Sequence, residues 1–368
     1  MKTLYGLKQA GREWNIELDT KLRRRGYARL ILDSCVYIWR LEDDFIIITV
    51  WVDDLLLFAT TVTLKKKAIR DIETEWEVTS LGEPAKIVGI EISYIGDSIA
   101  ISSKQYIESI LAKEKLDRSN AVATPLDPNV PIEPNPEGNV GNRSNSYARL
   151  LGQLQYVATA TRPDITYAVN RLASYTANPS LQHTMALKHI LRYLSGTRSY
   201  GIVYSKCPKG DPLFHGYADA ALANSDECKS TTGYVYIAGN GAVTWSSKRQ
   251  LIQAHSSTEA EYVALSEAAC EACWLCNLYG ELGLLEDVAP TRIRGDNEGS
   301  IAMSKNPVFH ARTKHIDTRW HFIRELVQDE VVEIESCRDP DQTVDVLTKA
   351  LPRPKHIKHV ADMGLAPV

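Results

Sequence analysis

The sequence contains no long apolar run. The longest run, Phe45–Val52, is eight residues long, far short of the roughly 20 that a membrane-spanning helix needs. No secretory or targeting segment precedes Tyr5. We therefore expect a cytoplasmic or nuclear protein that is neither secreted nor embedded in a membrane.

A disulfide framework and a net positive charge are missing as well. The seven cysteines are odd in number and show no framework spacing, which favours a reducing compartment. Three of them, Cys270, Cys273 and Cys276, lie in a strongly helical stretch, so we interpret them as buried thiols. The alternative is a metal site, but structural zinc usually takes its cysteines from turns.

The net charge of −4 does not by itself indicate a nucleic-acid partner.

The charges are nevertheless distributed unevenly. Between Tyr147 and Lys206 there are seven basic residues and one acid, whereas between Asp211 and Asp345 there are 22 acids and 11 Lys or Arg. The first segment could bind phosphates, and the second concentrates carboxylates that could hold hard cations.

The length of 368 residues allows two domains, and composition and periodicity divide the chain further. We predict mixed α/β and α+β structure in the segments 1–115, 116–146 (a Pro-rich linker), 147–206 (basic helices), 211–352 and 353–368 (a tail). Within 211–352 we expect strands at 213–220, 232–238, 242–246, 291–295 and 331–336, and helices at 257–278, 297–305, 317–328 and 340–351.

Four acids of segment 211–352 occupy positions from which they could converge. Asp219 lies on the first strand and Asp296 ends the fourth. Glu261 begins the apolar face of the long helix, while Glu259, rotated by about 200°, should point to solvent. Asp345 lies in the first turns of the last helix, where the helix dipole favours an anion. Each acid alone is more often a solvated side chain, but together they would repel one another unless divalent cations lay between them.

A second acidic pair, Asp53-Asp54, separates two β-rich apolar runs, Phe45–Val52 and Leu55–Ala59. Such a hairpin tip is usually a solvated turn, and the alternative is a metal-binding pair. The histidines His310, His315 and His321 have gaps of five and six residues, which suit no single helical face, so we interpret them as structural or substrate-facing.

A series of sequence blocks follows one another along segment 211–352. They include His215-Gly-Tyr-Ala-Asp219, Lys229-Ser-Thr-Thr-Gly-Tyr234, Ser256-Ser-Thr-Glu-Ala-Glu261, Gly295-Asp-Asn297 and Asp345-Val-Leu-Thr-Lys349. Together these blocks resemble the RNase H domain of copia-type retrotransposons. The resemblance implies a five-stranded mixed sheet flanked by helices. It also implies that Asp219, Glu261, Asp296 and Asp345 hold two Mg²⁺ ions, or Mn²⁺, that cleave RNA in RNA–DNA hybrids. The family's usual Asp-Ala-Asp-Trp is here Asp219-Ala220-Ala221-Leu222, and 336–344 lacks the histidine found in many RNases H.

Further blocks lie earlier in the chain. They include Leu4-Tyr-Gly-Leu-Lys-Gln-Ala10, Trp51-Val-Asp-Asp54 and Thr161-Arg-Pro-Asp-Ile165. These blocks resemble the reverse transcriptase of the same retrotransposons, although Gly11 replaces the proline usual after the first block. The resemblance implies a partial polymerase palm over 1–115, with Asp53 and Asp54 as metal ligands, and a thumb or connection region over 147–206. In the family a further catalytic Asp lies upstream of the first block, so we expect the polymerase half to be inactive.

The expected partners are RNA–DNA hybrid, other nucleic acid and other retrotransposon products. The candidate nucleic-acid-binding residues are Arg162, Arg171, Lys188, Arg192, Lys248 and Lys314. Two alternatives stay open: a silent relic that at most binds nucleic acid, and a part of a complete RNA-directed DNA polymerase.

Overall fold

The computed structural model describes residues 7–135, 144–207, 212–225, 227–285, 289–305 and 317–368. It divides into two compact units, Met1–Val88 with Trp274–Asp287 and Gly89–Cys273 with Val288–Val368. The long helix α7 (Ser257–Glu281) contributes residues to both. No helix in the described residues is long and apolar enough to cross a membrane.

The first unit is an antiparallel sheet packed against two helices. Its strand order is β1-β2-β3-β4, and its core includes Leu18, Leu22, Ile46, Ile48 and Ile72. The elements are α1 (Ala10–Arg24), β1 (Ala28–Arg29), β2 (Val36–Leu41), β3 (Asp44–Trp51), β4 (Asp54–Ala59), α2 (Val62–Glu75) and the short β5 (Lys86–Ile87). The expected hairpin is confirmed, with Trp51 opposite Asp54.

Four helices of the second unit share one apolar core. They are α3 (Lys104–Lys113), α4 (Ser144–Ala160), α5 (Thr166–Ala173), which the 3₁₀ turn η1 (Pro163–Ile165) precedes, and α6 (Leu181–Gly196). Helix α3 buries Ile107, Ile110 and Leu111 in this core. The boundary between the two compact units therefore follows Val88 and not residue 115.

The Pro-rich segment also belongs to this helical part. Leu126 is buried in the same core. The carbonyl oxygen of Thr124 lies 3.0 Å from His189 Nε2, and that of Ile132 accepts a hydrogen bond from Arg171. Residues 124–132 of the expected linker are therefore packed against the helices.

A small antiparallel sheet joins residues that are far apart in the chain. In the second unit its strand order is β14-β8-β7-β6, formed by β14 (Leu365–Pro367), β8 (Tyr200–Tyr204), β7 (Ser98–Ser102) and β6 (Ile90–Ile95). Residues 353–368, for which the sequence predicts only a tail, instead form helix α10 (Arg353–Asp362) and β14, and they bury Val360, Met363 and Leu365.

The largest sheet has the order β11-β10-β9-β12-β13. Strands β9 (His215–Ala221), β10 (Thr231–Ala238) and β11 (Gly241–Arg249) are antiparallel, and β12 (Thr291–Gly295) and β13 (Val332–Ser336) continue the sheet in parallel with β9. Helices α8 (Glu298–Lys305) and α9 (Asp317–Gln328) lie between β12 and β13 in the chain. These elements agree with the predicted order to within a few residues.

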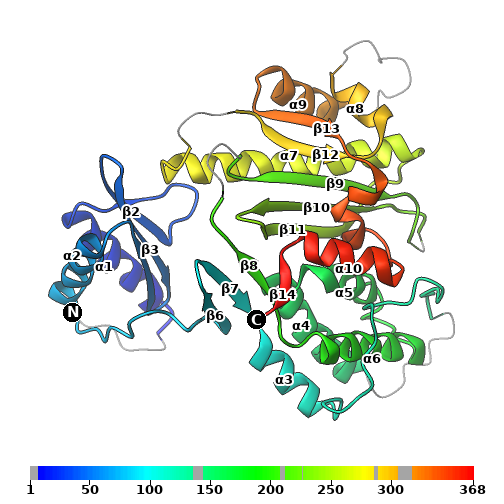
Figure 1. Cartoon of the computed structure of the whole chain (residues 1–368), viewed down its shortest axis with the longest axis horizontal. Helices are drawn as coiled ribbons and strands as arrows, with labels where there is room; N and C mark the ends of the chain where they lie inside the picture. Colours follow the sequence, from blue (N-terminus) through cyan, green and yellow to red (C-terminus); the bar gives the residue numbers. More distant parts are fainter. Residues whose placement is uncertain (1–6, 136–143, 208–211, 226, 286–288, 306–316) are drawn as a thin grey trace. The chain divides into compact units, whose positions relative to one another are not determined.

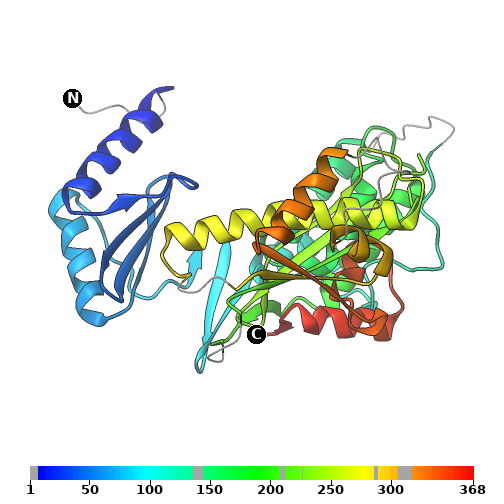
Figure 2. The same cartoon turned by 90° about the horizontal axis from the view of Figure 1, so that it is seen from above.

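Each face of this sheet is covered by a different segment (Figures 1 and 2). On one face Tyr236 donates a hydrogen bond to the carbonyl oxygen of Ala268 on α7, with 2.6 Å between oxygens. On the other face Val235 and Ile237 share a core with the 3₁₀ turn η4 (Thr343–Leu347). The chain as a whole is a mixed α/β protein with several sheets.

Candidate metal centre

Three of the four predicted acids come together at the end of the large sheet. Asp219 comes from β9, Glu261 from the second turn of α7, and Asp296 directly follows β12. Each offers a carboxylate oxygen, and these three oxygens lie within 4.8 Å of one another. The spacing is close to the roughly 4 Å that opposite ligands of one octahedral Mg²⁺ span. We call these residues the acidic triad.

Hydrogen bonds orient two members of the triad. The backbone amide of Ala220 donates to Glu261 Oε2 over 3.0 Å. The hydroxyl of Thr348 donates to Asp219 Oδ2. Gly233, directly opposite Asp219 on β10, permits the close approach of η4, because a Cβ there would lie 2.7 Å from Thr348 Cγ2.

The triad is electrostatically strained without a cation. Burial, followed by the neighbouring Asp219 and Asp296, raises the pKa of Glu261 to about 10. Burial also raises the pKa of Asp219 to about 6, although Lys349 opposes this, and it raises the pKa of Asp296. Carboxylates whose charged forms are disfavoured by burial and by one another gain from a bound cation. The donor set of hard oxygens fits a divalent ion such as Mg²⁺.

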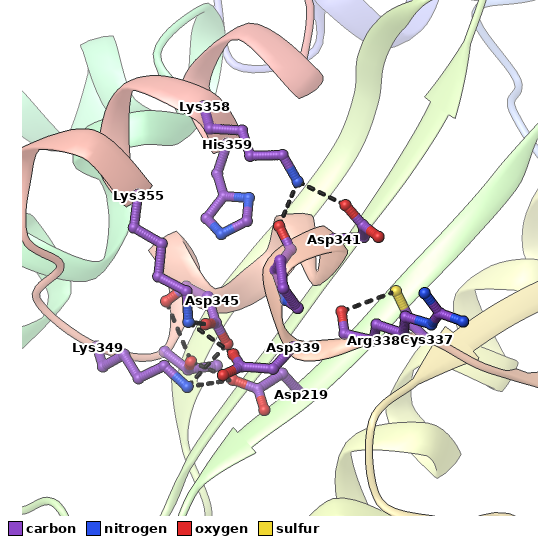
Figure 3. A network of polar contacts seen from close by, with 12 residues as sticks. Asp219, Cys337, Arg338, Asp339, Asp341, Asp345, Lys349, Lys355, Lys358 and His359 are labelled. Carbon is purple, nitrogen blue, oxygen red and sulfur yellow. Dashed lines mark hydrogen bonds and ion pairs between the residues drawn. The ribbon is translucent and has the colours of Figure 1, made fainter.

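The fourth acid, Asp345, is buried nearby but its carboxylate binds two lysines (Figure 3). Asp345 Oδ1 lies 2.8 Å from Lys349 Nζ and Oδ2 lies 3.0 Å from Lys355 Nζ. Lys355 also pairs with Asp339 over 2.6 Å. Among the described residues, the group close enough to share an ion contains the triad without Asp345.

The helix predicted around Asp345 is wrong. Residues 340–351 form only short 3₁₀ turns, η3 (Asp339–Asp341) and η4. Because Gln342 has φ −76° and ψ 82°, the two turns do not join into an α-helix. The charge of Asp345 is therefore balanced by lysines and not by a helix dipole.

Glu259 does not point to solvent, contrary to expectation. It is 8% exposed, and its carboxylate accepts the backbone N–H of His255 over 2.8 Å at the start of α7. The prediction of buried thiols is also wrong for Cys270, which is exposed, while Cys273 and Cys276 are half-buried. His310 and His315 lie outside the described residues, and His321 is exposed.

The hairpin acids Asp53 and Asp54 are exposed at the tip between β3 and β4. Trp14 Nε1 donates to the carbonyl oxygen of Val52 over 2.6 Å and so ties α1 to this tip. In the described part of the chain no third metal-ligating side chain joins them within reach of one ion.

The candidate nucleic-acid-binding residues have different environments. Arg162 cannot reach a phosphate, because its side chain is fully buried in an ion pair with Asp164. Arg171 donates to the carbonyl oxygen of Ile132, and Arg192 to that of Asn120, each over 2.8 Å. Lys188 and Lys248 are exposed, and Lys314 lies outside the described residues.

No role of Thr348, Lys349 or Lys355 was predicted from the sequence. A signal for Lys349 was available, because it follows Asp345 by four residues with the opposite charge. Lys355 carries no such signal, since its contact with Asp345 depends on the position of α10.

Comparisons with known proteins identify similar sequences. The family described as reverse transcriptase (RNA-dependent DNA polymerase) matches residues 1–128. The retrovirus-related Pol polyproteins from transposon TNT 1-94 of Nicotiana tabacum and from transposon RE1 of Arabidopsis thaliana are each 36% identical. These alignments cover 96% and 100% of this chain, and 27% and 25% of those proteins. The chain thus spans about a quarter of the length of these polyproteins.

A shorter relative is matched over most of its own length. The putative transposon Ty5-1 protein of Saccharomyces cerevisiae is 32% identical over 273 residues, which cover 73% of this chain and 87% of that protein.

Proposed function

The chain belongs to the copia-type retrotransposon Pol polyprotein family, and we propose that residues 211–352 form an RNase H domain that cleaves the RNA strand of RNA–DNA hybrids. The observation that carries this proposal is the acidic triad, three carboxylate oxygens within 4.8 Å of one another at the end of a five-stranded mixed sheet. Three antiparallel strands followed by two parallel ones agree with the architecture that the resemblance implies.

The triad supports a metal-dependent hydrolysis. A divalent ion bound there would lower the pKa of a water ligand and stabilise charge on the phosphate. Asp219, Glu261 and Asp296 would hold it, with Thr348 and the Ala220 amide fixing two of these carboxylates. Water attacks phosphorus, the bond to the 3′ oxygen breaks, and the products carry 3′-hydroxyl and 5′-phosphate ends.

The substrate assignment rests on the family and on exposed basic residues. Lys188 and Lys248 are exposed and could contact phosphates. Contacts to 2′-hydroxyl groups would select the RNA strand. Other retrotransposon products are further proposed partners.

A polymerase activity is a second candidate, favoured by the reverse transcriptase match over residues 1–128. Asp53 and Asp54 are its candidate metal ligands. Two-metal nucleotidyl transfer needs further ligands, and none joins this pair among the described residues. We therefore assign the 368-residue chain nuclease activity and no polymerase activity of its own.

The experiment is cleavage of an end-labelled hybrid by the purified chain in Mg²⁺, with single-stranded RNA and DNA duplex as parallel substrates. We expect cleavage of the hybrid's RNA strand alone, its loss in EDTA and its loss in Glu261→Gln. Glu298→Gln, an exposed position near the site, should cleave like the parent. Hybrid binding without cleavage in any metal would favour a silent nucleic-acid-binding relic.

A further inference from the structure

Lys349 lies between two buried acids, Asp219 of the triad and its neighbour Asp345. The ammonium group of Lys349 is 2.8 Å from Asp345 Oδ1 and 3.9 Å from Asp219 Oδ2 (Figure 3). The lysine side chain is 41% exposed, whereas those of Asp219 and Asp345 are 3% and 0% exposed. Lys349 therefore extends from the surface into the site.

Asp345 positions the ammonium group of Lys349. Asp345 Oδ1 forms an ion pair with Lys349 over 2.8 Å. The other carboxylate oxygen of Asp345, Oδ2, pairs with Lys355, and Lys355 also pairs with Asp339 over 2.6 Å. A metal ion could bind Asp345 only after displacing an ammonium group, so the buried carboxylate is available to Lys349 and not to a second ion.

The charges lead to the same conclusion. The triad and Asp345 carry four carboxylates, and Lys349 and Lys355 contribute two positive charges. One divalent ion in the triad would neutralise this cluster, while a second would make it positive. Lys349 thus occupies the place, and supplies the charge, that a second ion would otherwise provide.

We infer that Lys349 replaces a second metal ion at this site and binds the scissile phosphate. This inference rests on the proposed function. Water attacks phosphorus and releases a proton to solvent, and the 3′ oxygen leaves with the bonding electron pair and takes a proton from solvent. Lys349 stays protonated throughout and stabilises the negative charge that develops on the phosphate oxygens. An ammonium group on a flexible stem can serve as such a point charge.

The test counts bound metal in the full chain. Mn²⁺ is titrated into the protein and followed by electron paramagnetic resonance, alone and with a hybrid whose RNA strand is 2′-O-methylated. We expect one bound ion in the parent and two in Lys349→Met, which frees Asp345 Oδ1. Lys349→Arg keeps the charge and should bind one ion.

The matched control is Lys358→Met. Lys358 is 43% exposed, close to the 41% of Lys349, and it pairs with Asp341. It should bind one ion and cleave like the parent. With cleavable hybrid and a metal concentration that fills only one site, Lys349→Met should lose roughly 10²- to 10³-fold in kcat, a loss typical of removing one group that stabilises transition-state charge, with KM nearly unchanged.

The outcomes separate this inference from the proposed function. Two ions in the parent, with or without hybrid, would overturn the inference even if the chain cleaves. An unchanged metal count and kcat in Lys349→Met would overturn it as well. A parent that binds one ion, gains a second on Lys349→Met and cleaves no hybrid would refute the nuclease proposal while retaining the metal replacement.

Discussion

Arg162 and Asp164 form a fully buried ion pair, with Arg162 Nη2 2.6 Å from Asp164 Oδ2. The hydroxyl of Tyr193 donates to the same carboxylate oxygen over 2.6 Å, and Arg162 Nη1 donates to the carbonyl oxygen of Thr197. The pair therefore connects η1 to α6 inside the second unit. Its positive charge stabilises the fold and is not available to nucleic acid.

Replacing Arg162 alone should destabilise the protein strongly. Arg162→Met leaves the Asp164 carboxylate buried without its partner, which typically costs about 3–5 kcal/mol. Urea unfolding should show this loss in the free energy of unfolding. Lys188→Met, at an exposed position, is the control and should unfold like the parent. An Arg162→Met protein of parental stability that binds hybrid more weakly would restore the original nucleic-acid assignment.

His356 on α10 should make this part of the fold sensitive to acid. Burial lowers its pKa to about 4 from the ordinary 6.5, although the nearby Asp164 raises it. A lowered folded-state pKa contributes stability that is present above pH 6.5 and is lost as the pH falls toward 4. The loss corresponds to about 3 kcal/mol.

The parent protein is compared with His356→Phe. This variant keeps an aromatic ring next to Tyr193, whose ring centroid lies 5.3 Å from that of His356. The free energy of unfolding of the parent should fall more steeply between pH 6.5 and 4 than that of the variant. Parallel pH curves for the two proteins would show that His356 titrates normally in the folded state.

The 368-residue chain should not extend a primer on any template. The exposed pair Asp53 and Asp54 has no third metal-ligating partner in the described part of the chain. The measurement is incorporation of labelled nucleotide, with Asp53→Ala as the background. Incorporation above that background would assign polymerase activity to this chain.

Much of the fold could be predicted because local patterns were strong. The hairpin β3–β4 and the strands of the large sheet have β-rich apolar runs, and α7 has a sustained apolar face. By contrast β14 has three residues and pairs with β8, which is distant in the chain. No local pattern reports such a pairing.

The candidate site shows the same limit. The convergence of the triad could be predicted because Asp219 lies on a strand, Asp296 directly follows one, and Glu261 lies on the inward face of α7. The pairing of Asp345 with lysines was not predicted, because its partner Lys355 lies on α10, a helix that the sequence did not reveal. The burial of Arg162 was not predicted either. Asp164, the one acid in the basic segment, lies two residues away and could have suggested the ion pair.

The central claim is that the acidic triad performs metal-dependent cleavage of RNA in a hybrid, and Asp219→Asn tests it most directly. The measurement is Mg²⁺-dependent cleavage of a labelled hybrid together with hybrid binding, and Asp329→Asn at an exposed position is the control. We expect the parent and Asp329→Asn to cleave, and Asp219→Asn to bind the hybrid without cleaving it, because one metal-ligand charge is lost while phosphate contacts remain. Equal cleavage by Asp219→Asn and the parent would contradict the account.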